Sequence, residues 1–101
     1  RFTWWADVMR SAMNVSVRRV SFQFPAWDNT DGVYLAGSFN GWDPTVKPLK
    51  RSGAEYATTV LLEKGSYEYK FVVNGEWHTD PSREDCVVND QGSVNSVIHV
   101  N

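Results

Sequence analysis

The chain has 101 residues, which fits one domain with a single modest hydrophobic core. Hydrophobic residues make up 42% of the chain and charged residues 22%, a globular composition that excludes a largely disordered protein. The net charge of −2 argues against nucleic acid as a partner, and the single cysteine, Cys86, excludes an internal disulfide.

The same composition bears on location. No apolar run approaches the roughly 20 residues that a membrane-spanning helix needs, so we expect no membrane partner. One cysteine favours an intracellular, reducing compartment, either the cytoplasm or a plastid if the source is a plant or alga. The first residue is Arg1, which suggests a piece of a longer protein.

A short helix is predicted at the start of the chain. Residues 3–13 carry their apolar side chains on one helical face, and Asn14 is a plausible stop. We therefore expect an N-terminal helical flank over residues 1–14 and a separate module over residues 15–101. The helix would either pack on the edge of the domain or contact the rest of a parent protein.

After residue 14 the pattern changes to short strands separated by turns. Strands are expected at residues 15–24, 33–37, 55–63, 66–73, 76–79 and 94–100. Asn74-Gly75 is a strong hairpin turn, because both positions tolerate positive φ. Residues 47–52 read as an irregular basic segment and residues 80–92 as a polar loop. This arrangement predicts an all-β, antiparallel, immunoglobulin-like β-sandwich.

Two tryptophans follow strands and turn signals in this pattern. Trp42 ends the segment Gly37-Ser38-Phe39-Asn40-Gly41-Trp42, and Trp77 follows the hairpin turn at Asn74-Gly75. Large rings just past a turn often have no core to enter, and the apolar C–H face of a pyranose is a natural partner for an exposed indole. The alternative is that both rings fold back over the edge of the sandwich.

Two polar residues lie on strands near these rings. Lys70 is on the strand face opposite the stripe of Tyr67, Tyr69 and Phe71. It is either a solvated strand lysine or a donor to sugar hydroxyls. Asn95, near the start of the last strand, has poor strand propensity, so either a structural or a hydrogen-bonding role fits it.

Four blocks of the sequence, in the same order, resemble the glycogen-binding domain of AMP-activated protein kinase β subunits. That domain is one of the starch- and glycogen-binding modules of the isoamylase N-terminal type. The resemblance covers roughly residues 18–100. Its blocks are residues 33–42, 67–77, 80–81 and 92–98.

The resemblance implies a carbohydrate-binding set in this chain. In the family, two tryptophans stack on glucose units of an α-1,4-glucan, and Trp42 and Trp77 are similar to them. Lys70 and Asn95 stand where the family places a lysine and an asparagine that hydrogen-bond sugar hydroxyls, and Ser93 matches a small hydroxyl residue.

The chain departs from the family at three places, one of which is the loop over residues 82–90, about one residue longer than in the family. Gln91 stands where the family typically has a leucine that inserts into the curved sugar helix. The change bears on this apolar contact and on affinity for cyclic or tightly coiled oligosaccharides. The N-terminal helix has no counterpart in the family. The resemblance also makes Ser52, after Lys50-Arg51, a candidate phosphorylation site.

The predicted function is therefore non-catalytic binding of α-1,4-linked glucan, which targets or regulates a larger protein such as a kinase β subunit. The ligands implied are glycogen, starch, malto-oligosaccharides and cyclodextrin. We expect no catalytic residue, no metal and no cofactor. The alternative is an interaction module that docks a kinase or phosphatase domain through residues 1–14 or the basic segment 47–52, with weak or lost glucan binding.

Overall fold

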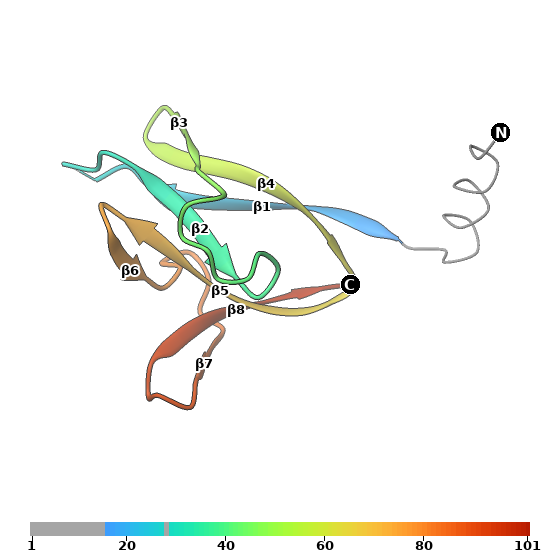
Figure 1. Cartoon of the computed structure of the whole chain (residues 1–101). Coiled ribbons are helices and arrows are strands. Elements are labelled where there is room, and N and C mark those ends of the chain that lie inside the picture. Colours follow the sequence, from blue (N-terminus) through green and yellow to red (C-terminus); the bar gives the residue numbers. More distant parts are fainter. Residues whose placement is uncertain (1–15, 28) are drawn as a thin grey trace, which may run out of the picture.

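The computed structural model describes residues 16–27 and 29–101, and all regular structure in these ranges is β-strand (Figure 1). The first sheet has the order β1-β4-β3, formed by β1 (Val17–Pro25), β4 (Glu55–Glu63) and β3 (Lys50–Ser52). The second has the order β2-β5-β8-β7, with β6 beside β5, and is formed by β2 (Val33–Gly37), β5 (Gly65–Val73), β6 (Glu76–His78), β7 (Cys86–Val88) and β8 (Val94–Val100).

All the strand pairs are antiparallel, which confirms the predicted all-β sandwich. The predicted helical flank, residues 1–14, lies outside the described residues. Within the ranges that the structure covers, no helix has the length and apolar character needed to cross a membrane.

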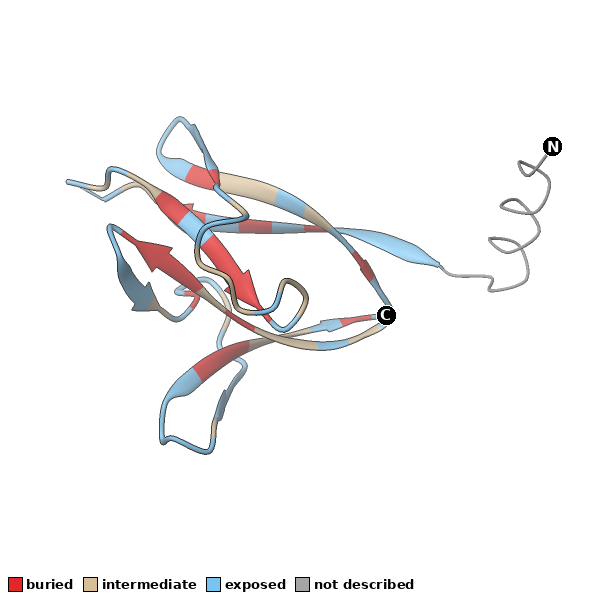
Figure 2. Cartoon of the chain, in the orientation of Figure 1, coloured by how far each residue is buried: buried red, intermediate tan, exposed pale blue. Residues whose placement is uncertain are grey.

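Strand alternation builds the core between the two sheets. On β1, Val20, Phe22 and Phe24 are buried while the residues between them are exposed. On β5, Tyr69 and Phe71 face the same interior, and their rings meet those of β1 edge to face, at 4.9 and 5.1 Å between centroids. Figure 2 shows the buried residues concentrated along the strands that face one another.

The two edges of β5 pair with different strands, and these pairings position the residues around Lys70. On one side β2 pairs with residues 69–73. On the other side β8 pairs with residues 65–69 and β6 with residues 71–73. Lys70 therefore lies where β8 stops and β6 starts, so both of these strands flank it.

The prediction of an irregular segment at 47–52 is wrong in part, because these residues run in an extended conformation. The Leu35 amide donates to the Lys47 carbonyl at 2.9 Å, and the Leu49 amide donates to the Val33 carbonyl at 2.8 Å. The chain then crosses to the first sheet as β3. The free edge of β2 explains this, since its amides and carbonyls need partners.

The polar loop predicted at 80–92 also contains a strand, β7, which pairs with β8. Before it, Asp80 is buried and tethers the loop to the second sheet: it accepts the Tyr69 hydroxyl at 2.6 Å, and its amide donates to the Ser96 hydroxyl at 2.7 Å. Arg83 donates to the Ser21 carbonyl of β1 at 2.9 Å, so the loop joins both sheets.

Candidate functional site

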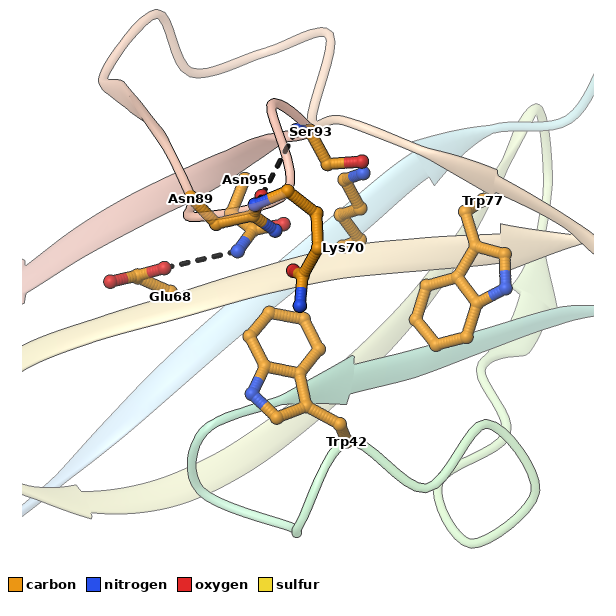
Figure 3. Close-up of a pocket in the computed structure, with 8 residues that line it drawn as sticks. Trp42, Glu68, Lys70, Trp77, Asn89, Ser93 and Asn95 are labelled. Carbon is orange, nitrogen blue, oxygen red and sulfur yellow. Dashed lines mark hydrogen bonds between the residues drawn. The ribbon is translucent and has the colours of Figure 1, made fainter.

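A groove of about 590 Å³ lies on the outward face of the second sheet (Figure 3). Its wall combines two indole rings with charged and neutral polar groups. The residues that line it are Trp42, Glu68, Lys70, Trp77, Asn89, Gln91, Ser93 and Asn95.

Strand alternation places the centre of the groove. Tyr69 and Phe71 are fully buried, so their neighbours Glu68 and Lys70 point to the opposite face of β5. Trp77 of β6 pairs with Val72 and therefore lies on that same outward face. The Asn74-Gly75 turn that returns the chain to Trp77 has the predicted positive φ at both positions, 51° and 85°.

Trp42 enters the groove from the loop after β2, on the other side of β5. Asn40 holds this loop closed: its Oδ1 accepts from the Gly37 amide at 2.9 Å, and its Nδ2 donates to the Leu35 carbonyl at 3.0 Å. The Trp42 amide donates to the Gly37 carbonyl at 2.9 Å, with Trp42 itself at φ 60°. A bulky residue in the left-handed region is strained, and such strain gathers at functional sites.

Asp43 completes the same loop. Its Oδ1 accepts from the Thr45 hydroxyl at 2.7 Å and from the Thr45 amide at 2.9 Å. These two bonds, the hydroxyl first, lower the pKa of the Asp43 carboxyl below its ordinary value. Asp43 is thus held as a loop-forming carboxylate next to Trp42.

The loop between β7 and β8 borders the groove as well, beside the strands β5 and β6 and the loop that carries Trp42. Asn89 closes it, because its Oδ1 accepts from the Gln91 amide at 3.0 Å and from the Ser93 amide at 2.9 Å. Gly92, at φ 81°, makes the reversal. The loop therefore presents Gln91 and Ser93 along one side of the groove.

Asn95 and Glu68 form the polar end of the groove. The Asn95 Nδ2 donates to the Glu68 Oε1 at 3.0 Å, with Asn95 itself buried (Figure 3). This bond fixes the amide so that its oxygen remains available as an acceptor. Lys70, with three N–H donors, complements that acceptor and the Glu68 carboxylate.

The two tryptophans are not part of the hydrophobic core. Trp77 is 45% exposed, Trp42 is half-buried, and both line the groove. The alternative that they plug the edge of the sandwich is therefore wrong. Trp27 is 48% exposed as well, but its ring packs edge to face on the core residue Phe24, at 4.8 Å between centroids.

The groove gathers every residue predicted for carbohydrate binding. Trp42, Lys70, Trp77, Gln91, Ser93 and Asn95 all line it, whereas Ser52 is exposed on β3 of the other sheet. Sequence reasoning missed Glu68 and Asn89. The period of the strand offered a signal for Glu68, two residues before Lys70 on the same face, but Asn89 belongs to the groove only through the closed loop.

Comparisons with known proteins match this chain to proteins of one family. A family described as the glycogen recognition site of AMP-activated protein kinase matches residues 19–101. The chain is 44% identical over 68 residues to the 5′-AMP-activated protein kinase subunit beta-1 of Sus scrofa, which covers 67% of this chain and 53% of that protein. It is 46% identical over 68 residues to subunit beta-1 of Bos taurus, covering 67% of this chain and 24% of that protein.

A solved structure shares the fold. The crystal structure of maltogenic amylase from S. marinus aligns with a TM-score of 0.71 at 22% identity, over 82% of this chain and 13% of that one. The chain spans about half the length of the matched pig subunit and about a quarter of the cattle subunit. The family match, over most of the described residues, shows that this chain belongs to the family of glycogen recognition sites of AMP-activated protein kinase.

Proposed function

We propose that this chain binds α-1,4-linked glucan, such as glycogen, starch or malto-oligosaccharides, without chemical change to it. One observation carries the proposal: two partly exposed indole rings share one groove with Lys70, Ser93 and Asn95. The rings offer flat apolar surfaces to the C–H faces of glucose units. The lysine, hydroxyl and amide groups between them match the donors and acceptors of vicinal sugar hydroxyls.

Support for a non-catalytic role comes from the carboxylates near the rings. Glycoside hydrolysis needs two carboxyl groups that flank the sugar, about 5–10 Å apart. Among the described residues that line the groove, Glu68 is the one carboxylate. The buried Asp80 carboxylate accepts from Tyr69, Ser82 and Arg83, and Asp43 is bonded to Thr45. We therefore propose that the groove holds glucan and leaves its glycosidic bonds intact.

The groove is shallow and solvent-facing, so we expect modest affinity for a single chain. Micromolar to millimolar dissociation constants correspond to about 4–8 kcal/mol. Binding to a particle that displays many glucan chains would be much stronger through multivalency. In this proposal the module directs a larger parent protein, such as a kinase β subunit, to an intracellular glucan store.

The first experiment is calorimetric titration with maltoheptaose and with β-cyclodextrin. We expect saturable binding that the Trp42→Ala/Trp77→Ala double variant loses while it stays folded by circular dichroism. Trp27→Phe is the matched control, because it changes an equally exposed indole outside the groove. Binding by the double variant at the strength of the unaltered protein would refute the proposed site.

Docking of a kinase or phosphatase domain is the second candidate, and it can coexist with sugar binding. Ser52 and Arg51 are exposed on β3, on the sheet that does not carry the groove. Leu61 and Val46, 63% and 55% exposed, line an apolar depression of about 520 Å³ elsewhere on the surface. If neither sugar gives heat at millimolar concentration, this docking role becomes the leading function.

A further inference from the structure

A second groove lies directly beside the first. Its volume is about 450 Å³, and Glu68 lines both grooves. Its other lining residues are Ser66, Tyr67, Asp85, Cys86, Val87, Val97 and His99. The shared residue makes the two grooves neighbours on one continuous surface.

Strand alternation shows that the second groove continues the first along the strands. Ser66, Glu68 and Lys70 form one row on the outward face of β5, and Ser66 pairs with His99 of β8. Lys70 lies four residue steps after Ser66, which is about 13 Å of extended strand. The continuation starts beyond Glu68, at the end of the first groove that lies away from Trp77 (Figure 3).

The second groove offers hydrogen-bonding groups to its solvent side. The Ser66 hydroxyl lies 2.7 Å from the His99 Nδ1, and the His99 Nε2 lies 3.8 Å from the Asp85 Oδ2. Tyr67, Val87 and Val97 contribute apolar surface to the same groove. A mixture of apolar surface with donors and acceptors suits a sugar, as it does in the first groove.

Serine, histidine and aspartate also form hydrolytic triads, but this geometry does not fit one. In a triad the aspartate is buried and hydrogen-bonded to the imidazole. Here the Asp85 and His99 side chains are 70% and 56% exposed, and the 3.8 Å between them is longer than a hydrogen bond. The cluster is suited to contact hydroxyl groups rather than to activate Ser66.

We propose that the second groove binds further glucose units of the same α-glucan chain that occupies the tryptophan groove. This inference rests on the proposed function and extends it from short oligosaccharides to longer linear chains. Glu68 connects the two grooves, because it accepts from Asn95 on the side of the first and lines the second. A closed ring held by the tryptophans has no free chain end to enter the second groove.

The test compares two ligands by calorimetry: a linear malto-oligosaccharide longer than maltoheptaose, and β-cyclodextrin. The Ser66→Ala/His99→Ala variant should bind the linear chain about tenfold more weakly, from the loss of two hydrogen-bonding groups. Its affinity for β-cyclodextrin should equal that of the unaltered protein. The control variant Gln23→Ala/Thr59→Ala, at exposed strand positions of the other sheet, should change neither affinity.

A second variant, Ser66→Val/His99→Val, removes the same polar groups with residues that favour strands, and should give the same result. If the variants bind the linear chain as tightly as the unaltered protein, or lose affinity for both ligands equally, the inference is overturned and the proposed function survives. If the unaltered protein binds neither ligand, both the proposed function and this inference fail.

Discussion

Trp42 holds its ring in the groove from a backbone conformation that few bulky residues adopt. Its φ of 60° follows a φ of 67° at Gly41, so two successive residues are left-handed. For an L-residue this region costs roughly 1–2 kcal/mol, whereas glycine occupies it freely. The loop keeps a tryptophan in a backbone conformation that glycine adopts without strain, as expected of a residue retained for its ring.

Two substitutions at this position separate backbone strain from the loss of the ring. We expect Trp42→Gly to be more stable than Trp42→Ala by about 1 kcal/mol, since only the alanine keeps the strain. Both should lose glucan affinity to the same extent. Urea denaturation measures the first difference and calorimetry the second. An alanine variant as stable as the glycine variant would mean that the loop relaxes and stores no strain.

At the scale of elements, the loop between β7 and β8 depends on one side chain. The Asn89 Oδ1 accepts from the amides of Gln91 and Ser93, and these bonds fix the loop that forms one wall of the groove. Asn89 is only partly buried and lies outside the hydrophobic core. Its contribution should therefore be seen in ligand binding rather than in the stability of the sandwich.

We expect Asn89→Ala to weaken glucan binding about 3- to 10-fold, because both amides lose their acceptor and the loop is no longer held. Asn89→Asp should retain most of the affinity, since a carboxylate oxygen accepts from the same amides. Calorimetry with maltoheptaose distinguishes the two variants. Equal losses in both would show that the amide nitrogen contacts the sugar directly and that loop closure is not the main role.

At the scale of the whole molecule, one hydrogen-bonded network, from the buried Tyr69 and Asp80 to the partly exposed Arg83, joins the two sheets. Tyr69 of β5 donates to Asp80, and Arg83 donates to the Ser21 carbonyl of β1 while its guanidinium lies 5.3 Å from the centre of the Phe22 ring. Tyr69 faces the core, whereas the groove is on the opposite face of the same sheet. Stability and ligand binding can therefore be changed separately.

Tyr69→Phe should lower the free energy of unfolding by about 1.5–3 kcal/mol, the range for a hydrogen bond to a charged group. Glucan affinity should not change. Burial, then the hydrogen bond to Asp80, raise the pKa of the Tyr69 hydroxyl above its ordinary value of 10.0. The stabilisation is complete below about pH 10 and is lost above it, where the unfolded chain releases the proton first.

The gap in stability between the unaltered protein and Tyr69→Phe should therefore narrow as the pH rises beyond 10. Urea denaturation of both proteins between neutral and alkaline pH measures it. Tyr67→Phe is the control, because Tyr67 is only partly buried and its hydroxyl donates to a backbone carbonyl, that of Glu63. A gap that stays constant with pH would refute the role assigned to the buried hydroxyl.

Sequence reasoning reached the fold because the main strands have strong local signals. The alternation of Val20, Phe22 and Phe24 and the turn at Asn74-Gly75 mark a strand and a hairpin without reference to the rest of the chain. The short strands β3 and β7 were missed, although each pairs with the strand that directly follows it along the chain. A segment of three exposed residues carries no periodic signal of its own.

The functional site, like the fold, could be predicted from the sequence only in part. Strand period placed Lys70 on the outward face, and turn signals singled out the two tryptophans. The resemblance gave these residues a sugar-binding role and added Gln91 and Ser93. Neither could show that β6 and β8 meet end to end beside β5, although this arrangement brings Trp77 and Asn95 to either side of Lys70. The hairpin of β5 and β6 is local, but the pairing of β5 with β8 joins segments that are distant in the sequence, and no local pattern encodes it.

The two loops that border the groove have a consequence for engineering. Asn40 closes one of them and Asn89 the other, each by hydrogen bonds to backbone within five residues of itself. Each loop is thus closed by its own asparagine, on a scaffold that the network of Tyr69, Asp80 and Arg83 holds together. A library that randomises the exposed positions of either loop, and keeps its asparagine, would sample new sugar specificities on an unchanged framework.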